Sequence, residues 1–200
     1  MVKILSVNCQ GLGDIAKRKD VFNYLRSLDY NIYCLQDTHF SCDTENEVRN
    51  LWGYQCFFRS YCTNSRGVAI LVNNNFDFKP LVEKGDVDGN YLLLKPRIEG
   101  HEVLICTVYG PNNDNPLFFE NVQKHIDDMQ CSNIIWCGDF NLVLNPVLDY
   151  YNYKNVNNPK ARDKVLELME NYGYVDPFRQ LHVNIRRFSW RKKILLNKVV

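Results

Sequence analysis

The chain has 200 residues, of which 46% are hydrophobic and 13% are aromatic, enough for one sizeable core, so we expect a single domain over residues 1–200. The 24 basic and 23 acidic residues nearly cancel, which excludes a global electrostatic attraction to nucleic acid or to a membrane. No segment resembles a secretory signal or a membrane span, and the eight cysteines form no CxxC pair. The cysteines therefore indicate small buried thiols in a reducing compartment. Together with the lack of a predicted signal or span, they lead us to expect a nuclear or cytoplasmic protein without a membrane partner.

Hydrophobic periodicity predicts a mixture of strands and helices along the chain. The predicted strands are 3–8, 31–36, 55–61, 68–74, 91–96, 101–110 and 134–137. The predicted helices are 16–28, 44–53, 115–129, capped by Asn115, and 159–173, which begins at Pro159 and ends at Gly173. Because the two types are mixed without strict alternation, we expect an α+β fold of mainly antiparallel sheets with helices on the outer faces.

Four predicted strands end in polar side chains: Asn8, Asp37, Tyr109, and Asp139 together with Asn141. The last case is the most specific, because residues 134–137 read as a strand buried on both faces and Gly138 then frees the backbone to turn. Alternation sends Asp139 and Asn141 to one side while the residue between them packs inward. The competing interpretation is a polar turn in which these side chains bond to their own backbone.

Two carboxylates, two amides and a phenol, with no nucleophilic serine or cysteine in an elbow, suit a hard divalent cation with oxygen ligands. Mg²⁺ is the natural candidate, with Mn²⁺ as an alternative, and it points to phosphoester hydrolysis. In this scheme Asp37 holds the metal and Asn8 supports it. Asp139 orients or deprotonates the attacking water, while Asn141 and Tyr109 hold phosphate oxygens.

Each of these residues also has a structural interpretation when taken alone. Asn8 is typical of a loop cap, Asp37 of a cap on the helix that follows, and Tyr109 of an interface aromatic with its hydroxyl in water. His39, in "DTH", has no second histidine or cysteine at metal spacing, so we favour a structural hydrogen bond over metal ligation.

The chain also resembles a known family through six motifs that occur in the family's order. These motifs are "VNCQGLG", "YCLQDTHF", "SRGVAILVNN", "VYGPNND", "CGDFNLVLNP" and "FSWRKK". The family is that of the endonuclease/exonuclease/phosphatase proteins. Within it, "LQDTHF" and "FSWR" are most similar to the amino-terminal endonuclease domain of LINE-type, non-LTR retrotransposons.

The resemblance implies a deoxyribonuclease-like fold, a four-layer sandwich of two β-sheets flanked by helices. It also implies a magnesium-dependent hydrolase that nicks one strand of duplex DNA and leaves a 3′-hydroxyl, which primes a fused reverse transcriptase in complete elements. By motif match, Asn8 and Asp37 are metal-site residues and Tyr109 lies on the phosphate side. Asp139 and Asn141 form the water-activating pair.

The sequence departs from the family's pattern in two places. The family's metal ligand is most often glutamate, whereas Asp37 is one methylene shorter. The family's arginine-leucine-aspartate segment and its terminal Ser-Asp-His do not occur, so we expect a C-terminal truncation that lacks the last strands of the sandwich. Two alternatives to an active endonuclease therefore stay open: a DNA-binding or metal-binding remnant without catalysis, and a phosphatase or deadenylase.

Nucleic acid would be held by local basic residues, because net charge supplies no attraction. The candidates are Arg66 in the "NSRG" turn, and Arg191 and Lys192 in a terminal cluster that is interleaved with aromatic residues. The run 17–19 at the start of the first helix is a weaker candidate, since a charged helix face is usually only solvated. No base-reading element is recognisable, so we expect duplex DNA to be recognised through its backbone and groove shape.

Overall fold

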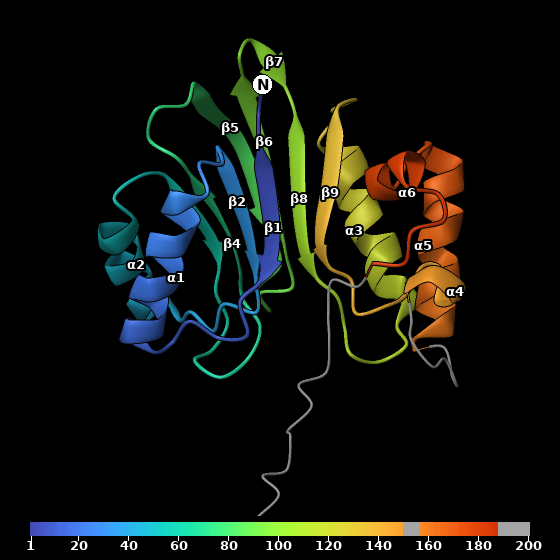
Figure 1. Ribbon diagram of the computed structural model, residues 1–200, viewed down its shortest axis with the longest axis horizontal. Helices are drawn as coiled ribbons and strands as arrows, with labels where there is room; N and C mark the ends of the chain where they lie inside the picture. Colours follow the sequence, from blue (N-terminus) through green and yellow to red (C-terminus); the bar gives the residue numbers. More distant parts are fainter. Residues whose placement is uncertain (150–156, 188–200) are drawn as a thin grey trace, which may run out of the picture.

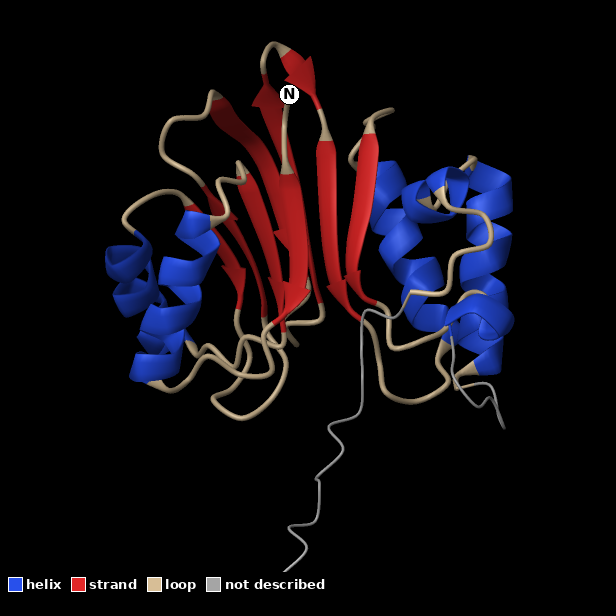
Figure 2. Ribbon diagram, in the orientation of Figure 1, coloured by secondary structure: helices blue, strands red, loops and turns tan. Residues whose placement is uncertain are grey.

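The computed structural model describes residues 1–149 and 157–187. Two β-sheets lie face to face in its centre, and helices cover the outer face of each sheet (Figure 2). The expected α+β sandwich of four layers is therefore confirmed. Of the seven strand pairs among the described residues, five are antiparallel and two are parallel.

The first sheet has the strand order β1-β2-β4-β3. Its strands are β1 (Ile4–Asn8), β2 (Ile32–Gln36), β3 (Cys56–Arg59) and β4 (Val68–Val72). Its outer face is covered by α1 (Ile15–Ser27) and α2 (Glu45–Trp52), the latter preceded by the short helix η1 (Cys42–Thr44) (Figure 1). Asp14 caps α1 by accepting a hydrogen bond from the backbone N–H of Lys17, at 2.7 Å.

The second sheet has the strand order β5-β6-β8-β9, with β7 paired to β6. Its strands are β5 (Phe78–Gly85), β6 (Tyr91–Ile98), β7 (His101–Glu102), β8 (Leu104–Tyr109) and β9 (Ile134–Asp139). Helices α3 (Pro116–Asp128), α4 (Pro146–Asp149), α5 (Pro159–Tyr172) and α6 (Pro177–Leu181) lie on its outer side (Figure 1). The predicted caps are confirmed, since Asn115 accepts from the N–H of Phe118 and Gly173 ends α5 in the left-handed conformation.

Three apolar layers hold the sandwich together. One lies between α1, α2 and the first sheet and contains Phe22 and Trp52, and one between the two sheets contains Ile70 and Leu92. Between the second sheet and its helices, two adjoining clusters bury residues such as Val122. All five residues of β2 are buried, as the unbroken apolar run predicts for a strand covered on both faces.

Strand β5 was not predicted from the sequence, and its residues explain why. Pro80 interrupts the run, most of the strand is exposed, and a register shift lies between Pro80 and Val82. These are features of an edge strand, which has no apolar alternation to detect. The short helices α4 and α6 were also missed, and the predicted strand 101–110 is divided into β7 and β8.

Two further expectations were that the cysteines are buried thiols and that no segment spans a membrane. All eight cysteines are free thiols, and Cys34, Cys56 and Cys106 are buried as expected, whereas Cys42 is exposed. Among the helices in residues 1–149 and 157–187, none combines the length and the apolar character that crossing a lipid bilayer requires.

Candidate active site

The five predicted site residues lie at one end of the two sheets, where β1, β8 and β9 end; these are the lower ends of the strands in Figure 1. The two parallel strand pairs create this arrangement. In the first sheet β1 runs parallel to β2 with Asn8 opposite Gln36, and in the second β8 runs parallel to β9 with Tyr109 opposite Asp139. Parallel neighbours end at the same edge, so the residues that follow them share one surface.

Asn8 and Asp139 join the two sheets directly. The Nδ2 of Asn8 donates to Oδ2 of Asp139 at 2.8 Å, and the backbone N–H of Asn141 donates to Oδ1 of Asp139 at 3.0 Å. Each carboxylate oxygen therefore accepts one hydrogen bond, which holds the plane of the carboxylate in one orientation. The Oδ1 of Asn8 accepts from the N–H of Gln10 at 2.9 Å, so this side chain also caps the loop as its structural interpretation proposed.

Asp37 lies directly after β2 and beside the loop that follows β1, since its carbonyl oxygen accepts from the N–H of Gly11 at 2.8 Å. Its side-chain Oδ1 accepts from the backbone N–H of Arg66 at 3.2 Å, and Nε2 of His39 lies 2.9 Å from the same oxygen. The carboxylate does not cap a helix, because the next helical turn begins only at Cys42. His39 makes the structural hydrogen bond that was favoured for it.

Tyr109 pairs with Asp139 in the strand register, and both carboxylates influence the titration of its phenol. Burial raises the pKa of Tyr109 above its usual value, and the negative charges of Asp37 and Asp139 raise it further. Hydrogen bonding to the side chains of Asn112 and Asn141 lowers the pKa, but these are smaller effects than burial. The phenol therefore stays protonated at neutral pH and keeps an O–H that can donate a hydrogen bond.

Asn141 completes the group in a left-handed conformation, with φ of 52°. Its Nδ2 donates to the carbonyl oxygen of Gly110 at 2.6 Å, and its own carbonyl accepts from Nδ2 of Asn158 at 2.9 Å. Phe140 points to the other side, where it stacks on Phe119 with a centroid distance of 5.9 Å. The inward packing of Phe140 is confirmed, and the bond from the N–H of Asn141 to Oδ1 of Asp139 is the local contact that the polar-turn interpretation predicted. The support from Asn158 was not foreseen, because only the fold brings it to this turn.

Gly138 and its strand differ from the prediction in two respects. Gly138 lies within β9 opposite Val108, with φ of 139°, and a Cβ there would lie 2.1 Å from the carbonyl oxygen of Val108. The glycine thus permits close approach of β8 and β9 and does not start the turn. The prediction that residues 134–137 are buried on both faces is wrong, since Ile135 is exposed and its neighbours are only partly buried. Among the described strands β9 is at the sheet edge, which leaves its side partly open.

The donor set fits a divalent cation that prefers oxygen and keeps several waters. Of the described residues, none donates a hydrogen bond to Oδ2 of Asp37, whereas both carboxylate oxygens of Asp139 accept one. No cluster of three or more His, Cys, Asp or Glu side chains with metal-binding geometry occurs in the described part of the chain. One or two carboxylates are typical of Mg²⁺ sites, where substrate phosphate and water supply the other ligands, whereas a structural zinc site would need more protein ligands.

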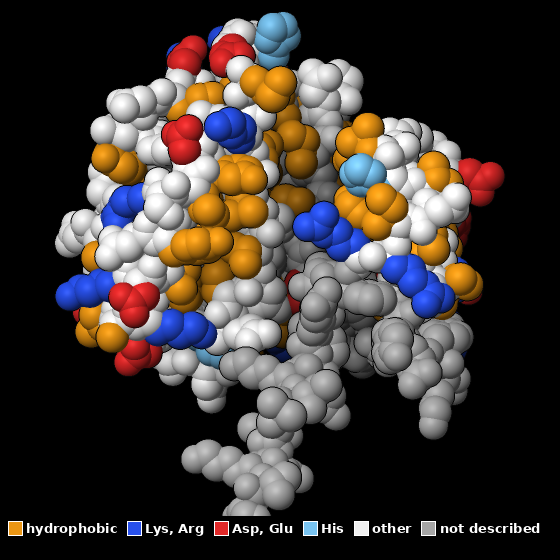
Figure 3. Space-filling view, in the orientation of Figure 1, with side chains coloured by type: hydrophobic (Ala, Val, Ile, Leu, Met, Phe, Trp, Pro, Cys, Tyr) orange, Lys and Arg blue, Asp and Glu red, His pale blue; other side chains and the backbone are white. Residues whose placement is uncertain are grey.

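The predicted DNA-binding residues divide into three groups. Arg66 lies at the rim, with its guanidinium 4.8 Å above the ring of Tyr61. Arg191 and Lys192 lie outside the described residues. In the helical run 17–19, Arg18 is buried and its Nη2 donates to Glu47 at 3.1 Å, so it cannot contact phosphate. The face seen in Figure 3 carries Lys and Arg side chains scattered among Asp and Glu, which agrees with the absence of a global basic field.

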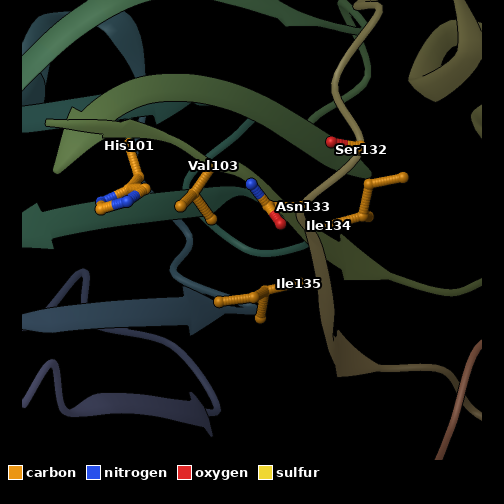
Figure 4. A pocket seen from close by; sticks show the side chains of 6 residues that line it. All are labelled: His101, Val103, Ser132, Asn133, Ile134 and Ile135. Atoms are coloured by element: carbon orange, nitrogen blue, oxygen red, sulfur yellow. The ribbon is translucent and has the colours of Figure 1, made fainter.

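A surface hollow lies at the opposite end of the second sheet, where β8 and β9 begin. Its lining residues are His101, Val103, Ser132, Asn133, Ile134 and Ile135 (Figure 4). Leu104 pairs with Ile134 at this end, whereas Tyr109 pairs with Asp139 at the other, so the hollow is separate from the candidate site.

Comparison with known proteins decides the family. The Endonuclease/Exonuclease/phosphatase family matches residues 5–166, which span every predicted site residue in the described part of the chain. The chain belongs to this family. Members of the family are generally dependent on a divalent metal and include nucleases and phosphoesterases.

Two curated proteins are similar over nearly the whole chain. A transposon TX1 uncharacterized 149 kDa protein from Xenopus laevis is 25% identical over 196 residues, which are 94% of this chain and 14% of that protein. An exodeoxyribonuclease from Bacillus subtilis is 27% identical over 213 residues, covering 94% of this chain and 79% of the relative. The chain thus spans only a small part of the transposon protein. One of these two relatives is a transposon protein, as the resemblance to retrotransposon endonucleases led us to expect.

Among solved structures, an AP endonuclease from Archaeoglobus fulgidus is similar with a TM-score of 0.69 and 22% identity. The similarity covers 98% of this chain and 80% of the other. At this identity the match establishes the family's fold, the expected deoxyribonuclease-like sandwich.

Proposed function

We propose that this chain is a Mg²⁺-dependent phosphodiesterase that nicks one strand of duplex DNA and leaves a 3′-hydroxyl. The observation that carries the proposal is the hydrogen bond between Asn8 and Asp139, which brings the ends of the two sheets together with Asp37 beside them. Two carboxylates, two amides and a phenol then lie at the same edge of the sandwich. The names of the relatives, an exodeoxyribonuclease and an AP endonuclease, support DNA as the substrate.

The contacts suggest a role for each residue. Asp37, through its open Oδ2, and Asn8 would hold Mg²⁺ or Mn²⁺, which supplies charge neutralisation on the phosphate when bound. Asp139 orients the attacking water and accepts its proton, because its carboxylate is held in place by Asn8 and Asn141. Tyr109 donates to a phosphate oxygen, which is consistent with its raised pKa. The side chain of Asn141 would contact a second phosphate oxygen.

We also propose that the chain derives from a LINE-type retrotransposon in which a reverse transcriptase follows the nuclease. The similarity to a transposon protein that is much longer than this chain supports this origin. Arg66 is the proposed contact to the DNA backbone among the described residues, and the bond from its backbone N–H to Asp37 supports this proposal.

Supercoiled plasmid tests the proposal. The chain is incubated with plasmid and Mg²⁺, and a parallel sample contains a chelator. The variants Asp139→Ala and Asp163→Ala are assayed in the same way, the second being a control that removes an exposed carboxylate of α5. Open circles should form only with metal and should be lost in Asp139→Ala, by about 10²–10⁴-fold in rate, while Asp163→Ala keeps full activity. Extension of the nick by a DNA polymerase checks the 3′-hydroxyl.

Two other results would point to the alternatives. Salt-dependent DNA binding that survives Asp139→Ala without any product would indicate a DNA-binding remnant. Hydrolysis of a small phosphoester or of adenylate RNA in preference to plasmid would indicate a phosphatase or deadenylase. Nicking at the wild-type rate by Asp139→Ala would contradict the proposed role of this residue.

A further inference from the structure

His39 touches the proposed metal site without having any part in the chemistry assigned above. Its Nε2 lies 2.9 Å from Oδ1 of Asp37, and its side chain is only 22% exposed. A carboxylate oxygen can only accept, so the proton of this hydrogen bond belongs to Nε2 of the imidazole.

The ring is held in this position by the loop between β1 and α1. A Cβ added to Gly11 would lie 2.7 Å from Nδ1 of His39, so the glycine leaves just enough room for the imidazole against the backbone. The backbone N–H of His39 donates to the carbonyl oxygen of Arg66 at 2.8 Å. The imidazole therefore lies between Gly11 and Asp37 in a fixed orientation.

The local backbone adopts an uncommon conformation to make this contact. Asp37 and His39 both have positive φ, 54° and 57°, which is unfavourable for residues with a side chain. With Thr38 between them bonded through its N–H to the carbonyl of Gly67, the turn directs both side chains toward each other. The imidazole of His39 thereby reaches Oδ1 of Asp37 across a single intervening residue.

We propose that His39 is a positioning residue for the metal ligand Asp37. Together with the N–H of Arg66 it occupies Oδ1 of the carboxylate and fixes the rotation of the side chain, so that Oδ2 is presented to the cation. The inference rests on the proposed metal site and adds the group that orients its main carboxylate. Hydrogen bonds from an outer residue to a ligating carboxylate typically contribute about 10- to 100-fold in metal affinity.

Binding of Mn²⁺ to the full chain without DNA tests this role, because free Mn²⁺ gives an electron paramagnetic resonance signal that disappears on binding. His39→Leu removes the donor, His39→Asn retains an amide that is too short to reach Oδ1, and His39→Gln places an amide N–H near the position of Nε2. We expect Kd to rise about 10- to 100-fold in the first two variants and to stay within about threefold in His39→Gln. His101→Leu, at the opposite end of the sheets, is the matched control.

Thermal melts of each variant separate lost folding from lost binding, and the comparison of His39→Asn with His39→Gln holds even if His39→Leu does not fold. Wild-type affinity in His39→Leu and His39→Asn, with binding lost in Asp37→Asn, would overturn the role of His39 and leave the metal site intact. Absence of Mn²⁺ binding in the wild type, or unchanged binding in Asp37→Asn, would instead overturn the metal site and this inference with it.

Discussion

Asn8 and Asp139 are separated by 131 positions in the chain and by 2.8 Å in the structure. The amide belongs to the edge strand of one sheet and the carboxylate to the edge strand of the other, so this hydrogen bond crosses between the sheets at the candidate site. The orientation of the proposed water-activating acid consequently depends on a residue from the opposite sheet.

Asn8→Ala should slow nicking by about 10- to 100-fold, because a hydrogen bond to a charged group contributes roughly 1.5–3 kcal/mol. The rate is measured with supercoiled plasmid at saturating Mg²⁺, next to a thermal melt. Asn23→Ala, on the exposed face of α1, serves as the control and should keep wild-type activity. A variant that folds normally and nicks at the wild-type rate would show that Asp139 needs no support from the first sheet.

Arg66→Asn should weaken DNA binding while leaving the metal site in place. Arginine at this position has φ of 59°, which asparagine tolerates, and the backbone N–H that bonds to Asp37 is retained. We expect a higher KM for plasmid, an unchanged kcat, and a slope of log affinity against log salt that is smaller by about one unit. Arg97→Asn, at the distant end of β6, is the control, and an equal effect of both substitutions would argue against a specific contact.

Gln36→Leu should lower the free energy of unfolding by about 1–3 kcal/mol, since it leaves buried polar partners without a hydrogen bond. The Nε2 of Gln36, which is almost fully buried, donates to Thr107 Oγ1 of the other sheet at 2.8 Å and to Ser6 Oγ at 3.1 Å. Urea unfolding measures the loss. The double variant with Thr107→Val should lose less than the sum of the two single changes, whereas strict additivity would mean that the pair does not interact.

Gly138→Ala should prevent stable folding or cost about 4 kcal/mol or more, because the new Cβ would overlap the backbone of β8 and φ is unfavourable for alanine. Gly100 gives a matched control. It also has positive φ, at 84°, but nothing lies within 4 Å of the added Cβ, so Gly100→Ala should cost only about 1–2 kcal/mol. Similar unfolding midpoints for the two variants would show that close packing of β8 and β9 is not required.

Cys62 should be the thiol that alkylates fastest at neutral pH. Hydrogen bonding to the Ser65 side chain lowers the pKa of Cys62, whereas burial raises the pKa of Cys9 to about 12. A lower pKa leaves a larger thiolate fraction, so reaction of Cys62 with iodoacetamide should level off at a lower pH than that of Cys9. Peptide mass spectrometry over a pH series measures each site, and faster labelling of the exposed Cys42 would contradict the prediction.

Much of the sandwich could be predicted because its elements have strong local signals. The apolar run of β2 and the caps Asn115 and Gly173 identify elements from nearby residues alone. Strand β5 could not be predicted, since Pro80 and its exposed side chains remove the periodicity. The sequence predicts a turn at Gly138 because it does not show that the backbone of β8 packs against this glycine within β9.

For the candidate site, the sequence indicates the main polar residues but not the contacts that support them. Polar residues that end buried strands are visible in the sequence, and the structure brings Asn8, Asp37, Tyr109, Asp139 and Asn141 to one edge. The supporting contacts could not be foreseen. The N–H of Arg66 and the side chain of Asn158 reach the site only through the fold, and nothing in their local sequence distinguishes them from ordinary loop residues.

The two parallel strand pairs have a consequence for how the proposed site is lost on unfolding. Asn8 and Asp37 follow strands of one sheet, while Tyr109 and Asp139 end strands of the other, so neither half of the sandwich holds a complete site. In a partly unfolded state where each sheet keeps its own backbone hydrogen bonds but the two separate, circular dichroism would still register strands while every proposed catalytic contact between sheets is gone. The proposed nuclease activity, measured along a denaturant titration, should therefore be lost when the two sheets separate, before the circular dichroism signal of the strands is lost.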